Sequence, residues 1–463
     1  MLLALLGLGA ALPAAATIYR CEDDRGTVNF TDTRVPQARC RVVSADVGET
    51  APRVTRRQRG EVGEITIGPS RPGPGAPGSG PRQPVPTPGF IDAQKNLLEF
   101  RRREALAPFA TRWRTGSARI NILHLGDSHV HNGFAGAATR RALQAVRGDG
   151  GRGLVFPYAL AKTYSQSDYR SSFEGSWQSA NSVRPLPGLA LGVTGVAART
   201  TRAPAAFTLT FAPPLPPGRK VVKVFLKGSM PGLRLSASTG RQRQVLAAGW
   251  GAARALPVAE FELYDLERTL RLDIDSTAPG GSVEVHGVSI ESSRPGVAYH
   301  SLGVDGATLD SLNAQPFLAE QLAVLQPDMI VLDFGTNELI NNGNALPPGH
   351  EALVVQVIRR LRMARPDAVI VLTSAQDMNF QGRAITAARA YSDLMRKIAL
   401  EQGCLFWDWY RVAGGSGSMR SWVARGLANR DQIHLVAKGY QLKGELLAKA
   451  LLDTVAQYEQ PRR

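Results

Sequence analysis

The chain has few cysteines and few long apolar runs. It holds three cysteines in 463 residues, and no Cys/His spacing is typical of a zinc site. We therefore expect neither a metal nor another cofactor. The apolar residues 1–16 are short for a membrane span, and no other run of 18 apolar residues occurs, so no membrane-spanning segment is predicted.

Acidic residues are also scarce. The 39 Asp and Glu residues face 55 Lys and Arg residues, which leaves a formal charge of +16. A surplus of this size indicates an anionic partner. The basic residues do not alternate with aromatics as they would in a nucleic-acid groove, so we expect no nucleic acid. An acidic polymer or an anionic envelope surface fits the charge better.

The N-terminus predicts export. Residues 1–16 form an apolar stretch that ends in three alanines, a pattern typical of a signal peptide and its cleavage site. We expect a periplasmic or envelope-associated protein with no stable membrane insertion after cleavage. In an oxidising compartment Cys21 and Cys40 would form a disulfide. Cys404 lies in an apolar strand-like run and is expected to be a buried free thiol.

The first part of the chain divides by composition. Residues 17–50 contain two β-prone runs around an Asp-x-Gly turn, which predicts a small β domain. Residues 51–90 contain nine Pro, eight Gly and six Arg, and such a segment is a flexible linker because it cannot build a packed core. A helical pattern follows over residues 91–109.

The remainder predicts an α/β fold with an insertion. Residues 91–163 and 298–463 contain apolar strand-like runs that alternate with helical patterns, which indicates a parallel sheet covered on both faces by helices. Residues 164–297 lack helical periodicity and contain short alternating runs between Gly and Pro turns. This pattern predicts an inserted β-sandwich.

Four polar turns contain residue types that together can perform acyl transfer. A hydroxyl needs an imidazole to remove its proton and a carboxylate to orient that imidazole. Side chains that follow parallel strands meet at one edge of the sheet. The turns are Gly126-Asp-Ser-His129, Gly303-Val-Asp-Gly306, Gly335-Thr-Asn-Glu338 and Asp431-Gln-Ile-His434.

Each turn alone also has a purely structural interpretation. The Gly-Asp-Ser turn is a common strand-to-helix connection, in which Asp or Ser caps the helix. Asp431 could cap the last helix in the same way, and Asn337 could be an ordinary turn residue. The four turns in this order favour catalysis.

The four turns in sequence order resemble the SGNH (GDSL-type) serine hydrolase family, whose fold is a three-layer α/β/α sandwich around a parallel sheet. The resemblance implies that Ser128 is the nucleophile, His434 the base and Asp431 its partner. It also implies an oxyanion hole formed by the Ser128 N–H, the Gly306 N–H and the Asn337 side chain. Gly303 is a competing source of the glycine N–H.

At two positions the chain departs from the family motif, and there it resembles one subgroup of the family. His129 stands where the family motif has Leu, and Glu338 stands where the family more often has Asp. These variants resemble envelope enzymes that remove O-acetyl groups from peptidoglycan and carry a β-module between the first two motifs. Gly306 follows Ser128 by 178 positions here, far beyond the roughly 30 residues of a plain βαβ unit. Residues 17–50 resemble a small proteobacterial envelope domain of unknown function.

Three further residues are expected to contact substrate. Asp127 and His129 flank the serine, and Trp177 could stack on a sugar ring, although an aromatic near a strand end more often belongs to a core. The sequence thus predicts a monomeric, exported serine esterase that deacetylates a cell-wall polysaccharide through an acyl-enzyme on Ser128. The alternatives are a generic carboxylesterase, lipase or thioesterase, and a wall-binding protein without catalysis.

Overall fold

The computed structural model describes residues 18–22, 28–31, 39–44, 85–116, 118–229, 232–247 and 258–459. The predicted signal peptide and residues 51–84 of the predicted linker lie outside these ranges. Among the described residues, no helix is both long enough and apolar enough to cross a membrane.

Three N-terminal strands form the expected small β unit. They are β1 (Ile18–Glu22), β2 (Val28–Thr31) and β3 (Arg39–Ser44), and they pair antiparallel in the order β2-β1-β3. The register of β1 and β3 places Cys21 directly opposite Cys40. The side chains of this sheet lie outside the description, so the disulfide stays a prediction.

A six-stranded sheet forms the centre of the molecule, in the order β17-β5-β18-β19-β22-β4. The first five strands run parallel, and β4 pairs antiparallel at one edge. The five parallel strands are almost wholly buried, as expected for strands covered on both faces. The strands are β4 (Leu98–Glu99), β5 (Arg119–Gly126), β17 (Gly296–Gly303), β18 (Met329–Asp333), β19 (Val369–Thr373) and β22 (Leu405–Trp407).

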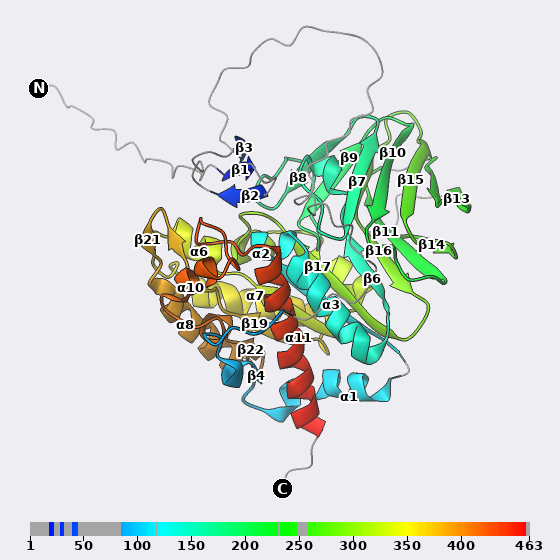
Figure 1. Cartoon of the computed structure of the whole chain (residues 1–463). Helices are drawn as coiled ribbons and strands as arrows, with labels where there is room; N and C mark the ends of the chain where they lie inside the picture. Colours follow the sequence, from blue (N-terminus) through cyan, green and yellow to red (C-terminus); the bar gives the residue numbers. More distant parts are fainter. Residues whose placement is uncertain are drawn as a thin grey trace, which may run out of the picture.

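Helices cover both faces of this sheet, which confirms the three-layer prediction (Figure 1). Successive strand residues point to opposite faces, so Ile330 packs into one core and Val331 into the other. One core includes α4 (Leu309–Asn313), α5 (Leu318–Leu325), α6 (Thr336–Asn341), α7 (His350–Ala364) and α8 (Ala387–Glu401). The other includes α1 (Ala107–Thr115), α3 (Phe134–Arg147), α9 (Trp409–Val412), α10 (Ser418–Ala424) and α11 (Ala437–Glu459).

The helix predicted over residues 91–109 is wrong. The segment forms two short 3-10 turns, η1 (Ala93–Lys95) and η2 (Arg103–Ala105), with β4 between them, and α1 begins at Ala107. Pro108 is the physical reason for the late start, because proline fits the first helical turn but disrupts a helix interior. Leu98 instead pairs with Trp407 at the sheet edge, where it joins the core.

Two antiparallel sheets form the inserted β-sandwich, which lies beside the α/β part (Figure 1). The first sheet contains β7 (Tyr169–Glu174), β10 (Ala205–Phe211), β12 (Arg234–Ser238), β13 (Arg243–Ala247) and β15 (Thr269–Ser276). The second contains β6 (Gly151–Val155), β8 (Gln178–Asn181), β9 (Val196–Thr200), β11 (Lys220–Lys227), β14 (Val258–Leu263) and β16 (Val283–Ser292). Strands β10, β14 and β15 alternate between buried and more exposed side chains, and Phe207, Leu270 and Val222 belong to the sandwich core.

Two chain connections join the sandwich to the α/β part, one at each end of the insertion. The chain returns from β16 through a short turn directly into β17, the edge strand of the parallel sheet. On the way out, β6 pairs with β16. Antiparallel pairing therefore begins before residue 164, where the sequence places the start of the module.

Candidate active site

Three of the four motif turns lie at the carboxyl ends of the parallel strands. Ser128 begins the short helix α2 (Ser128–His131) just after β5 ends, and Asp305 follows the end of β17. Asn337 lies in the first turn of α6, just after β18. These side chains meet because the strands that precede them are neighbours in the order β17-β5-β18.

The fourth turn lies in the loop before α11 and is held by neighbouring segments. The Gln376 side chain donates to the carbonyl of Ile433. Asn379, at the start of the two-residue strand β20 (Asn379–Phe380), bonds to Gln432 through its backbone N–H and its side-chain amide, at 3.0 and 2.8 Å. These contacts position the loop that carries His434.

Ser128, His434 and Asp431 form a continuous hydrogen-bonded chain. The Ser128 Oγ lies 2.9 Å from Nε2 of His434, and Nδ1 of that imidazole lies 2.8 Å from Oδ2 of Asp431. The other Asp431 oxygen accepts the backbone N–H groups of Ile433 and His434 at 2.9 and 3.0 Å. In this arrangement the imidazole can take the proton of the hydroxyl while the carboxylate holds its orientation.

Nearby carboxylates change the basicity of His434. Burial alone would lower the pKa of His434, but the charge and hydrogen bond of Asp431 outweigh it, and Asp305 adds to the effect. The net result is a pKa above the ordinary histidine value. The protonated form of this imidazole is therefore stabilised.

Asn337 and Gly306 are the residues expected to complete an oxyanion hole with the N–H of Ser128. Asn337 Nδ2 donates to the carbonyl of Ala307 at 3.0 Å and lies 3.4 Å from Oδ2 of Asp127, so the amide is held next to the serine turn. Gly306 has a positive φ of 80° and open space beside it, with Val183 as the nearest side chain to an added Cβ. Gly303 instead packs against the serine turn, because a Cβ there would lie 2.3 Å from the carbonyl oxygen of Asp127. These surroundings favour Gly306.

Asp127 is buried under the serine turn. Its side chain caps α2 by accepting the backbone N–H of His129 at 2.9 Å. Burial raises the pKa of Asp127 to about 8, although the bond from His129 opposes the shift. Because Asp127 is 1% exposed, we propose that it orients the turn and Asn337 without touching substrate.

His129 is buried as well and supports the catalytic imidazole. It is 3% exposed, its ring stacks on that of His434, and its Nδ1 lies 3.0 Å from the Tyr440 hydroxyl. Its Nε2 is buried, and no described residue forms a hydrogen bond with it. We propose a positioning role for His129 in place of the substrate contact expected from the sequence.

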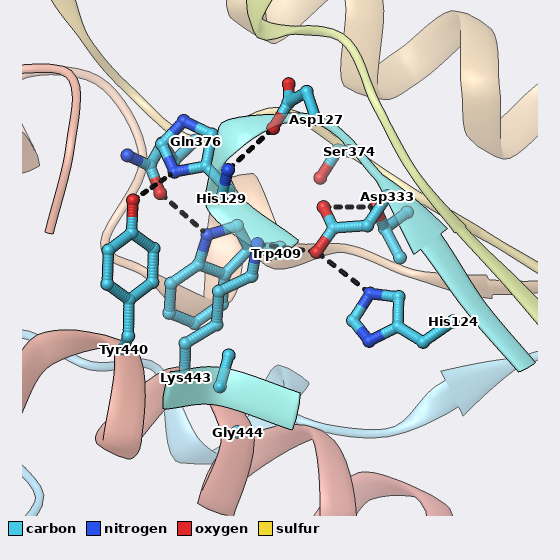
Figure 2. Close-up of polar contacts among 12 residues, drawn as sticks. His124, Asp127, His129, Asp333, Ser374, Gln376, Trp409, Tyr440, Lys443 and Gly444 are labelled. Atoms are coloured by element: carbon cyan, nitrogen blue, oxygen red, sulfur yellow. Dashed lines mark hydrogen bonds and ion pairs between the residues drawn. The ribbon is translucent and has the colours of Figure 1, made fainter. Parts of the chain in front are cut away.

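A buried ion pair lies behind these residues (Figure 2). Asp333, the last residue of β18, accepts a bond of 2.7 Å from Lys443 of α11 and lies 3.2 Å from Nε2 of His124. Its other oxygen accepts the Thr373 hydroxyl at 3.1 Å. Burial would raise the pKa of Asp333, but Lys443 and His124 outweigh it and lower that pKa. The network ties α11 to the sheet directly beneath the site.

Trp177 lies apart from the triad. It occupies the turn between β7 and β8, where its ring packs edge-on against Phe207 of the sandwich and its indole N–H donates to the carbonyl of Glu174. The indole is half-buried against the sandwich core. Its role in binding sugar stays a proposal.

Several residues of the site carry no sequence signal. Asp333, Lys443 and Tyr440 have ordinary neighbours in the chain and meet the motif residues only through the fold. Asp305 stands in the second motif turn, but the sequence assigned it no role. Glu338 belongs to a motif, but its function is structural: it accepts the backbone N–H groups of Gly335 and Leu309 at 2.9 and 2.8 Å. Among the described residues, no cluster of three or more His, Cys, Asp or Glu could hold a metal ion.

Comparisons with known families match two parts of the chain. Residues 285–442 match the GDSL-like Lipase/Acylhydrolase family, and residues 4–59 match a Domain of unknown function (DUF4124). The first match contains Gly306, Asn337, Asp431 and His434, whereas Ser128 precedes the sandwich and lies outside it. No curated protein sequence matches the chain.

One solved structure shows the same fold. It is described as "Peptidoglycan O-acetylesterase in action, 5 min" and aligns with a TM-score of 0.65 and 24% identity, over 76% of this chain and 97% of its own.

Two other alignments are much weaker. A family two carbohydrate esterase from Cellvibrio japonicus aligns with a TM-score of 0.27 and 12% identity, over 62% of this chain and 100% of its own. Axe2, an acetylxylan esterase from Geobacillus stearothermophilus, aligns as a catalytic mutant with a TM-score of 0.26 and 18% identity, over 36% and 76%.

Proposed function

This chain carries a hydrolase domain of the GDSL-like lipase/acylhydrolase family, and on that premise we propose that it is a serine esterase that removes O-acetyl groups from a carbohydrate polymer. Peptidoglycan is the proposed polymer. The observation that carries the proposal is the hydrogen-bonded chain from Ser128 through His434 to Asp431, with the Asn337 amide beside the serine turn.

In the proposed acylation step, Ser128 Oγ attacks the carbonyl carbon of the acetyl ester. Nε2 of His434 takes the hydroxyl proton, and Asp431 stabilises the resulting imidazolium. The negative charge that develops on the carbonyl oxygen faces the N–H groups of Ser128 and Gly306 and the amide of Asn337. When the ester C–O bond breaks, His434 gives its proton to the departing sugar oxygen.

Deacylation repeats the same steps with water. His434 removes a proton from a water molecule, whose oxygen attacks the acetyl-serine carbonyl. The second tetrahedral intermediate uses the same three donors, and Ser128 leaves as it regains the proton from His434. Acetate is released and the site returns to its starting state.

Three features support an acetylated wall polymer as substrate. The fold matches a structure described as a peptidoglycan O-acetylesterase. A β-sandwich stands between the serine motif and the remaining motifs, so substrate at the site lies near a second domain. The formal charge of +16 favours residence near anionic envelope polymers.

We further propose that the protein is exported to the periplasm or cell envelope. The support is the apolar N-terminal stretch, typical of a signal peptide, which precedes the short β domain. Fractionation of cells that express the full-length chain, compared with a variant lacking residues 1–16, tests this. We expect the full chain with the envelope fraction and the shortened chain in the cytosol.

The enzymatic proposal is tested by acetate release from O-acetylated peptidoglycan, acetylated xylan and a long-chain acyl ester. We expect peptidoglycan to be the best substrate. Ser128→Ala should abolish release from all three, whereas Ser276→Ala, an exposed serine of the sandwich, should behave as wild type. Undiminished turnover in Ser128→Ala would refute the mechanism.

The same assay separates the alternative functions. Preference for the long-chain ester would indicate a lipase. Tight binding to cell walls with no hydrolysis of any ester would indicate a non-catalytic wall-binding protein.

A further inference from the structure

Another carboxylate, Asp305, lies in the turn that follows β17. Its Oδ1 lies 2.9 Å from Nδ1 of His131 and accepts the Tyr164 hydroxyl at 2.9 Å. The rings of His131 and Tyr164 stack on each other, with centroids 4.3 Å apart and planes 17° apart. Asp305 is thus fixed by two aromatic groups that also pack together.

The partners of Asp305 are themselves rigid. His131 is 3% exposed, lies at the end of the helix that Ser128 begins, and also packs on the Tyr158 ring at 4.6 Å. The Asp305 carboxylate is therefore held in a constant position relative to the nucleophile. A prearranged polar group of this kind is what a specific ligand contact requires.

The Asp305 side chain is charged and partly exposed to solvent. Burial would raise the pKa of Asp305, but His131 and Tyr164 outweigh it and lower that pKa, so the carboxylate is ionised at neutral pH. The side chain is 34% exposed. Both described bonds go to Oδ1, and no donor within the described residues reaches Oδ2.

Asp305 itself lies close to the proposed catalytic residues. Gly306, the proposed oxyanion donor, is the next residue, and the charge of Asp305 acts on His434. Val183, from the loop between β8 and β9 of the sandwich, is the nearest side chain to an added Cβ on Gly306, and it is 44% exposed. The turn thus lies where the sandwich meets the catalytic site.

We propose that Asp305 is a substrate-binding residue whose Oδ2 accepts a hydrogen bond from a hydroxyl or an amide N–H of the sugar unit that carries the ester. The proposal rests on the function proposed above and adds a determinant of specificity to it. An ionised acceptor favours polyol and N-acetylamino sugar esters over simple esters without a donor. It also disfavours substrates with a negative group at this position.

The experiment compares two esters in the full-length enzyme. One is an O-acetylated N-acetylglucosamine oligosaccharide, and the other is para-nitrophenyl acetate, which has no donor for Asp305. Rates are taken on the pH plateau of each variant, so that a changed His434 pKa does not enter. Asp305→Ala should raise KM for the sugar ester by about tenfold to a hundredfold, the size of one lost bond to a charged group. Its kcat/KM for the sugar should fall at least about tenfold more than for the small ester.

Three further variants protect the test against misfolding. Asp305→Asn keeps an acceptor but loses the charge, so its selectivity should lie between wild type and Asp305→Ala. Tyr164→Phe removes one anchoring bond and should shift selectivity in the same direction by less. Asp453→Ala removes an exposed carboxylate of α11 that pairs with Lys449 and should leave selectivity as in wild type. Thermal melting of each variant reports folding.

The outcomes separate this inference from the proposed function. Equal losses on both esters in Asp305→Ala and Asp305→Asn, or no loss on either, would overturn the role of Asp305 alone. A wild-type enzyme that cleaves para-nitrophenyl acetate but not the acetylated sugar would overturn the proposed function and this inference with it.

Discussion

The imidazole of His129 lies against that of His434, with ring centroids 5.2 Å apart and ring planes 25° apart. Burial lowers the pKa of His129 well below its ordinary value, and the nearby His434 and Lys443 lower it further. His129 is therefore neutral when His434 takes the serine proton. A neutral, stacked ring restricts the orientation of the base without opposing its charge.

The first prediction concerns this stacked pair. His129→Ala should lower kcat/KM for a small acetyl ester by about tenfold to a hundredfold, because the catalytic imidazole gains freedom to rotate. His129→Phe keeps a ring at the same place and should retain most of the activity. Steady-state kinetics with matched melting curves measure the effect, and equal losses in both variants would argue against positioning by stacking.

The second prediction concerns pH. Catalysis needs neutral His434, so activity should fall as pH decreases through a pKa that lies above the ordinary histidine value. The Asp431 charge raises that pKa. Asp431→Asn should therefore move the acidic limb of the kcat/KM profile to lower pH, while the maximum rate also falls. An acidic limb that stays in place would show that Asp431 does not act on His434.

The third prediction concerns the oxyanion. Asn337→Ala should lower kcat by about 10²–10³ with little change in KM, because the lost N–H donor acts on charge that develops in the transition state. Asn342→Ala is a suitable control. This asparagine follows the same helix, and its side chain donates a hydrogen bond to the carbonyl of Glu338. An effect confined to KM would assign Asn337 to substrate binding.

The fourth prediction concerns the buried pair beneath the site. Lys443 and Asp333 are 3% and 6% exposed, so Lys443→Met leaves a buried carboxylate without its cation. Unfolding free energy should fall by about 3–5 kcal/mol. The exposed pair Lys449–Asp453 on the same helix is the matched control, where Lys449→Met should cost less than about 1 kcal/mol. Urea denaturation measures both, and similar costs would contradict the assignment.

The fifth prediction concerns the cysteines. Cys404 is buried and free, and burial raises the pKa of its thiol to about 11. Cys21 and Cys40 oppose each other in the β1–β3 register and should be linked in protein recovered from the periplasm. Thiol titration under denaturing, non-reducing conditions should find one reactive thiol. Finding three would reject the disulfide.

Much of the fold could be predicted from local patterns. The parallel sheet with an inserted sandwich is confirmed. Buried strands and amphipathic helices each carry a periodic signal in their own residues. The pattern at residues 91–109 misled because Leu98 joins the sheet edge, a pairing with a strand some 300 positions away.

The residues of the candidate site also fall into two groups, those that the sequence marks and those that only the fold brings together. Short motifs contain Ser128, Asn337, Asp431 and His434. The sequence alone could therefore predict these residues as members of the site. Asp333, Tyr440 and Lys443 were not predicted, because nothing in their own segments marks them. They meet the motif residues because β17, β5 and β18 are neighbours in the sheet and α11 packs against it. Periodicity records whether a residue is buried, but the strand order and helix packing decide which distant side chain it meets there.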